Sequence, residues 1–124
     1  MDSDTPQVLV VDDDPTARDV SMRMLKRLGV LSAGAHDGEA AFQLVKAVPF
    51  AAVFLDWELP DSPGNVVAQR LRELKPELPI IGLSGYSPED TNSTVFDLYL
   101  TKPVTTKDFA RALKLVHVPL NAPI

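Results

Sequence analysis

The sequence predicts an α/β domain in which five parallel strands alternate with helices on both faces of one sheet. Five short apolar runs recur along the chain, and the segments between them carry helical spacing. The runs lie at Val8 to Val11, Leu31 to Ala35, Ala52 to Leu55, Ile80 to Leu83 and Leu98 to Thr101. They are apolar runs more than an alternation of apolar and polar residues, as strands buried on both faces require. The 124 residues fit one domain with five strands and five helices.

The first two helices have clear boundary signals. Asp14 is a suitable cap for the first, with Pro15 at its start and Gly29 just after its end. The second is expected from Asp37 or Gly38 up to Pro49, because a proline disfavours helix in the residue before it. Both helices have an apolar face that can cover the sheet.

The third and the last helix are bounded in the same way. The third is expected from about Asn65 and stops before Pro76. The last begins at Thr105 or Thr106 and ends ahead of Pro119.

The segment Pro88 to Phe96 should form the fourth of the five helices. It contains the run Asp90-Thr91-Asn92-Ser93-Thr94, and these residue types disfavour helix by on the order of 2 kcal/mol in total relative to alanine. We therefore predict a short, frayed or mobile helix, with an ordinary helix rescued by tertiary packing as the alternative.

Composition excludes several classes of protein. Seventeen acidic residues against twelve Lys and Arg give a net charge of -5, which argues against direct nucleic-acid binding. Cysteine is absent, so disulfides and thiolate metal sites are excluded. No apolar run is long enough for a membrane span, and the acidic start is unlike a signal peptide. We expect a cytoplasmic domain without membrane insertion, and packing or surface roles for its two histidines, His36 and His117.

Polar residues that can support chemistry follow four of the strands. Asp12 and Asp13 follow the first strand, Asp56 the third, Ser84 the fourth and Lys102 the fifth. In a doubly wound sheet the carboxyl ends of the strands form the ligand-binding edge. These five residues should therefore converge.

The chemistry of this set is complementary. Carboxylates close to one another repel unless cations offset their charge, and Mg2+ together with Lys102 would do so. Mg2+ keeps coordination positions for phosphate oxygens, so Asp56 could attack phosphorus while Lys102 and the Ser84 hydroxyl contact the phosphoryl oxygens. The expected product is an acyl phosphate on Asp56.

Four motifs together resemble the receiver domain of two-component response regulators, in particular the single-domain chemotaxis regulators. They are Val10-Val11-Asp12-Asp13, Leu55-Asp56 with Leu59-Pro60-Asp61-Ser62-Pro63-Gly64, Leu83-Ser84-Gly85 and Lys102-Pro103. The resemblance covers nearly the whole chain and implies a flavodoxin-like sheet of order 2-1-3-4-5. It implies a single receiver domain over residues 1–124, with a core of about 7–117 and short tails.

The resemblance also implies metal and phosphoryl roles for individual residues. Asp56 would be the phosphorylated residue and a Mg2+ ligand, with Asp13 as a direct ligand and Asp12 as a ligand through water. Glu58 would bind the ion through its backbone carbonyl. Lys102 would contact the phosphoryl group, and the peptide bond before Pro103 is often cis in this family.

Signalling in the family depends on a switch pair, for which Ser84 and Tyr99 are the matching residues. A histidine kinase or a histidine phosphotransfer protein would supply the phosphoryl group, and an unknown protein would bind the altered face. Such a domain catalyses only its own phosphorylation and dephosphorylation, and is not otherwise an enzyme. At the variable position two residues after Ser84, Tyr86 is expected to shield the phosphoryl group from water.

One departure from the family affects the switch. Where the family often has Gly-Ala before the fifth strand, this chain has Val95-Phe96, and Phe96 could brace or crowd the fourth helix. The coupling of Tyr99 to Ser84 depends on that arrangement.

Other interpretations stay open at this point. A Mg2+-dependent phosphatase of the haloacid dehalogenase type also uses a strand-terminal aspartate, but its motif has a second Asp where this chain has Glu58. A non-phosphorylated docking module with the receiver fold is a third possibility. The residues also have simpler roles available, as helix caps for Asp12 to Asp14 and Ser84, a surface charge for Lys102 and static packing for Tyr99.

Overall fold

The computed structural model describes residues 7–85 and 95–120. Within them five strands alternate with four helices. The strands are β1 (Gln7–Val11), β2 (Leu31–Ala35), β3 (Ala52–Asp56), β4 (Ile80–Ser84) and β5 (Leu98–Thr101). The helices are α1 (Pro15–Arg27), α2 (Gly38–Ala47), α3 (Gly64–Leu74) and α4 (Thr106–Leu115).

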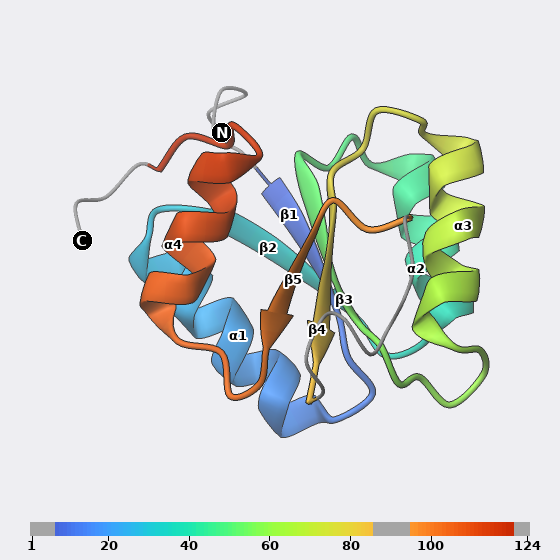
Figure 1. The fold of residues 1–124 in the computed structure, drawn as a ribbon, viewed down its shortest axis with the longest axis horizontal. Helices are drawn as coiled ribbons and strands as arrows, with labels where there is room; N and C mark the ends of the chain where they lie inside the picture. Colours follow the sequence, from blue (N-terminus) through green and yellow to red (C-terminus); the bar gives the residue numbers. More distant parts are fainter. Residues whose placement is uncertain (1–6, 86–94, 121–124) are drawn as a thin grey trace.

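The strands form one parallel sheet of order β2-β1-β3-β4-β5, which confirms the predicted fold class and strand order. Helices α1 and α4 cover one face, and α2 and α3 cover the other (Figure 1). Val11 of β1 pairs with Leu55 of β3, so Asp12 and Asp56 reach the same edge of the sheet. Leu83 of β4 pairs with Asp56 itself.

Apolar residues of the strands are divided between two core layers. In β3 the ring of Phe54 faces α4 and meets Phe109 edge to face, with ring centroids 4.8 Å apart. Its neighbours Val53 and Leu55 enter the other layer with Leu71 of α3. All five side chains are fully buried. Burial on both faces is therefore the reason the central strands β1, β3 and β4 are so largely apolar, whereas the edge strands β2 and β5 are partly exposed.

The predicted boundaries of the first two helices are confirmed. The Asp14 carboxylate accepts a hydrogen bond from the Thr16 N–H at 3.0 Å, and Gly29 follows the helix with a φ of 77°. The Asp37 carboxylate accepts a hydrogen bond from the Ala40 N–H at 2.8 Å and caps α2 directly before its first residue. These side chains satisfy N–H groups that have no partner within the helix.

The other two helices begin differently from each other. Helix α3 starts at Gly64, one residue earlier than expected, and Pro63 before it provides no side-chain cap. Helix α4 begins after Thr105, which forms a reciprocal capping box with Asp108.

The expected fourth helix falls mostly on residues 86–94, which lie outside the described residues, as does Tyr86. Val95 and Phe96, at its expected end, are not helical. Among the described helices, none is both long and apolar enough to cross a bilayer.

Candidate functional site

Three carboxylates meet at the carboxyl edge of the sheet. Asp12, Asp13 and Asp56 each offer an oxygen atom, and the three oxygens lie within 4.8 Å of one another. Asp12 is 2% exposed and Asp56 6% exposed, whereas Asp13 lies open to solvent. The structure thus brings together the two acids that follow β1 and the last residue of β3.

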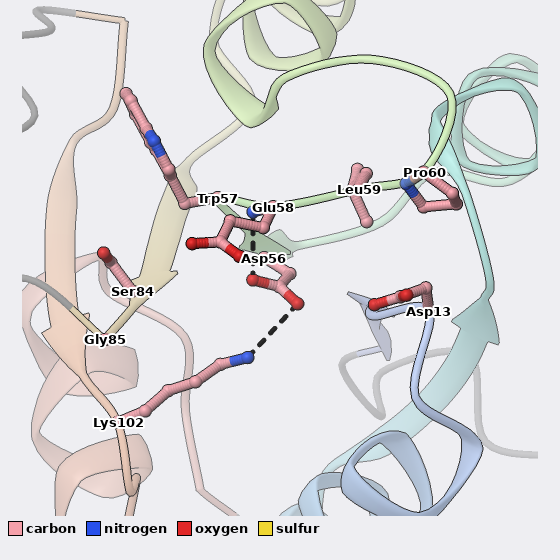
Figure 2. A pocket seen from close by; sticks show the side chains of 9 residues that line it. All are labelled: Asp13, Asp56, Trp57, Glu58, Leu59, Pro60, Ser84, Gly85 and Lys102. Atoms are coloured by element: carbon pink, nitrogen blue, oxygen red, sulfur yellow. Dashed lines mark hydrogen bonds and ion pairs between the residues drawn. The ribbon is translucent and has the colours of Figure 1, made fainter.

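Lys102 completes this group from the end of β5. Its Nζ lies 3.1 Å from Asp56 Oδ2 and 3.7 Å from Asp12 Oδ2. The other Asp56 oxygen, Oδ1, accepts a hydrogen bond from the Glu58 N–H at 3.2 Å. Figure 2 shows Asp56 between these two partners, with Asp13 opposite Lys102. The peptide bond between Lys102 and Pro103 is cis, as expected.

Asp12 is held in place by its own backbone. Its N–H donates to the Ala35 carbonyl of β2 at 3.0 Å, and its carbonyl accepts from Arg18 Nη1 at 2.8 Å. Its carboxylate accepts from the Asp14 N–H at 3.0 Å. Such surrounding hydrogen bonds orient a carboxylate before any ligand arrives.

The group opens into a cavity of about 580 Å³. Its lining comprises Asp13, Asp56, Trp57, Glu58, Leu59, Pro60, Ser84, Gly85 and Lys102. Figure 2 shows the Ser84 hydroxyl on the same side of Asp56 as the Trp57 ring. The cavity is large enough for a phosphoryl group beside Asp56.

The surroundings of Asp56 disfavour its ionised form. Burial raises the pKa of its carboxyl, even though the Glu58 N–H and the Lys102 ammonium lower it. For Lys102, burial lowers the pKa, but attraction by Asp56 and Asp12 outweighs burial and raises it. The ammonium therefore stays charged at neutral pH.

A hard dication fits this donor set. Three ionised carboxylates against one ammonium leave two negative charges in a partly buried place, which a dication would balance. Oxygen atoms are the ligands that Mg2+ prefers. Asp12, Asp13 and Asp56 could therefore hold the ion. The backbone of Glu58, two residues after Asp56, lies beside them.

The two candidate switch residues lie at different depths of the sheet edge. Ser84 is 3% exposed, lines the cavity and pairs with Thr101 of β5. Tyr99 pairs with Gly82 instead and is half-buried. Its ring lies 5.0 Å from that of Phe96 and 6.4 Å from that of Trp57, measured between centroids.

Several contributing residues carry no sequence signal of their role. Arg18, in the first turn of α1, donates a hydrogen bond to the carbonyl of Asp12 before the helix, and Asp61 accepts hydrogen bonds from Gly38 and Glu39. The residues of each pair belong to different elements. The Asp61 motif was visible in the sequence, but its partner lies 23 residues away.

A family model identifies the chain. The model for the response regulator receiver domain matches residues 8–114. The chain belongs to this family. As a receiver domain, it is a part of two-component signalling proteins, and its family is generally a signalling family and not an enzymatic one.

Similar proteins include sensor kinases and response regulators. The autoinducer 1 sensor kinase/phosphatase LuxN of Vibrio harveyi is 36% identical over 85% of the chain, which spans only 13% of LuxN. The two-component response regulator ARR22 of Arabidopsis thaliana is 30% identical, over 79% of the chain and 74% of that protein.

A solved structure extends the comparison to the fold. The response regulator TrrA of Thermotoga maritima, crystallised in complex with Mg(2+)-BeF, is 30% identical with a TM-score of 0.84. The alignment covers 90% of the chain and 99% of TrrA. The receiver fold is thus shared over 90% of the chain.

Proposed function

We propose that this receiver domain accepts a phosphoryl group on Asp56 from a phosphohistidine, with Mg2+ bound beside it. The observation that carries the proposal is the position of Asp56. Its carboxylate lies 3.1 Å from Lys102 Nζ and in a group with Asp12 and Asp13 whose oxygens lie within 4.8 Å. The cavity above it is open.

The transfer forms one bond and breaks another. An Asp56 carboxylate oxygen attacks phosphorus, forming a P–O bond as the P–N bond to the donor imidazole breaks. The imidazole leaves with the electron pair of that bond. Its other ring nitrogen carries a proton, so the leaving group is neutral. Lys102 neutralises a phosphoryl oxygen, and the Ser84 hydroxyl contacts another. Mg2+, when bound, supplies further positive charge for the phosphoryl oxygens.

Each candidate ligand has a separate part in this proposal. Asp13 and Asp56 bind the ion directly, Asp12 binds through a water molecule, and Glu58 uses its backbone carbonyl. Ser84 and Tyr99 form the switch pair that changes the surface near β5. We propose one receiver domain with a folded core of about residues 7–117, and the family match over residues 8–114 supports this proposal.

The partners follow from the same chemistry. The phosphoryl donor is a histidine kinase or a histidine phosphotransfer protein in the cytoplasm, in keeping with the sensor kinases among the similar proteins. The downstream target is a protein that binds the phosphorylated form.

The proposal is tested by incubating the protein with Mg2+ and acetyl phosphate and measuring its mass. Wild type should gain one hydroxylamine-sensitive phosphoryl group, and Asp56→Asn should gain none. Asp19→Asn, an exposed carboxylate on α1, is the control and should behave as wild type.

Two outcomes would contradict the proposal. Equal phosphorylation of Asp56→Asn and wild type would remove Asp56 from its role. Multiple turnover of a small phosphate ester would favour the haloacid dehalogenase alternative, and absence of any phosphorylation with either acetyl phosphate or a phosphohistidine donor would favour the docking module.

A further inference from the structure

The loop of residues 57–63 joins β3 to α3 and carries Glu58, the proposed carbonyl ligand. Its base is closed by backbone contacts. The Gly64 N–H donates to the Trp57 carbonyl at 2.7 Å, and Glu58 forms an antiparallel bridge with Pro63. These contacts fix the two ends of the loop, and between them the Leu59 side chain packs against the apolar core.

The tip is attached to a different element by Asp61. Asp61 Oδ1 accepts a hydrogen bond from the Gly38 N–H at 3.0 Å, and Oδ2 accepts one from the Glu39 N–H at 3.1 Å. Gly38 and Glu39 are the first two residues of α2. Because both carboxylate oxygens are used, the loop cannot pivot about a single contact.

Helix α2 does not need Asp61 in order to be capped. Asp37, directly before the helix, already accepts from the Ala40 N–H at 2.8 Å. The helix therefore has one cap from its own segment and a second from the loop that follows Asp56. The second cap, unlike the first, ties the helix to the loop that carries Glu58.

The Asp61 carboxyl that makes this attachment is ionised at neutral pH. The Gly38 N–H lowers the pKa of the Asp61 carboxyl, slight burial opposes this, and the Glu39 N–H and nearby His36 lower it further. An ionised carboxylate at a helix N-terminus gains from the N–H groups and from the positive end of the helix dipole.

We propose that Asp61 is a positioning residue for the metal site, which holds the Glu58 carbonyl in place by tying the loop tip to α2. This inference rests on the proposed function, since it concerns the same Mg2+ ion. Asp61 is not a ligand. It acts through the loop, so its loss weakens Mg2+ binding without removing any metal-binding group.

The test compares two caps of the same helix. Mg2+ affinity is measured from the emission of Trp57, the single tryptophan, and from the Mg2+ concentration that gives half-maximal phosphorylation by acetyl phosphate. Asp61→Ala should weaken Mg2+ binding by roughly 5- to 10-fold, at or just below the lower limit of the roughly 10- to 100-fold that loss of a supporting group costs a metal site. Phosphorylation at saturating Mg2+ should reach the same extent as in wild type.

Asp37→Ala is the matched control. It removes the local cap of α2 and should destabilise the protein to a similar degree in urea, yet its Mg2+ affinity should stay within about twofold of wild type. Asp61→Asn keeps one acceptor oxygen and should fall between wild type and Asp61→Ala. It also serves if the alanine variant folds poorly.

The outcomes distinguish a failure of this inference from a failure of the proposed function. Wild-type Mg2+ affinity in Asp61→Ala, or equal weakening in Asp37→Ala, would overturn the positioning role while leaving the proposed function intact. If wild type itself shows no Mg2+-dependent phosphorylation, the proposed function fails and this inference fails with it.

Discussion

Phe96 packs its ring against that of Trp57, with 5.5 Å between the ring centroids. Trp57 follows Asp56 directly, and Phe96 lies two residues before the start of β5, so the contact joins the candidate site to the strand that carries Tyr99. Phe96 is only 8% exposed. Its ring also lies 5.0 Å from that of Tyr99, so Phe96 contacts both Trp57 and Tyr99.

Phe96→Ala should destabilise the protein by about 3 kcal/mol, because it removes a buried ring and leaves a cavity. Trp57 emission should shift to the red as water reaches the indole. Phe42→Ala is the control. Phe42 is partly buried on α2 beneath Arg70, so its loss should lower the free energy of unfolding by less and leave Trp57 emission unchanged. Both quantities are measured in one urea titration, and equal costs would contradict the packing role of Phe96.

Gly82→Ala should clash with the same ring. A Cβ at Gly82 would lie 3.0 Å from Phe96 Cδ1 and 3.0 Å from Tyr99 Cδ1, and such overpacking costs about 1–3 kcal/mol. The alanine should cost less in the Phe96→Ala background, since one of the two clashes is absent there. A double-mutant cycle of unfolding free energies measures the coupling, and additive effects would argue against the contact.

Gly64→Ala should disturb the loop after Asp56. The new Cβ would lie 2.7 Å from Trp57 Cα and 2.8 Å from the Asp56 carbonyl oxygen, and backbone atoms cannot rotate away. We expect a loss of about 2–4 kcal/mol in stability and a weaker response to Mg2+. Gly85→Ala is the control, because nothing lies within 4 Å of its added Cβ. In urea titrations, the free energy of unfolding of Gly85→Ala should be close to that of wild type.

Asp56→Asn should stabilise the metal-free protein at neutral pH. Burial raises the pKa of the Asp56 carboxyl above its ordinary 3.8, so the neutral form contributes stability that is fully present below that value. This contribution is lost as the pH rises through the raised pKa. The gain from Asn should therefore shrink toward acid pH, when urea unfolding is compared in EDTA across the pH range. A gain that is the same at every pH would contradict this origin, and Mg2+ should stabilise wild type only.

Arg72→Lys should cost about 1–3 kcal/mol, because the guanidinium of Arg72 joins three segments. Its Nη1 donates to the Leu78 carbonyl at 2.7 Å, and its Nη2 donates to the Val95 carbonyl and to Asp97 Oδ2, both at 2.8 Å. Lysine cannot reproduce that fork.

The control for Arg72 is an exposed arginine. The pair of Arg23 with Asp19 on the surface of α1 is 3.0 Å long with Arg23 77% exposed, so Arg23→Lys should cost at most about 0.5 kcal/mol. Thermal unfolding of the two variants gives the comparison, and similar losses would show that the Arg72 fork adds little.

The sequence by itself determined the fold class, the strand order and three of the acids at one edge. Strands buried on both faces must be apolar, and a parallel sheet collects the residues after its strands, so local patterns were sufficient for Asp12, Asp13 and Asp56. The helix starts at Asp14, Asp37 and Thr105 followed from their own side chains, because a cap bonds to residues two or three places along.

Only the tertiary structure decided which distant residues support that edge. Arg18 on the Asp12 carbonyl, Asp61 on α2 and Phe96 on Trp57 each join segments that no local pattern relates. The physical reason is that hydrogen bonds and ring contacts act over a few ångströms, whatever the separation along the chain. Those contacts exist only once the sheet has brought its loops to the same side.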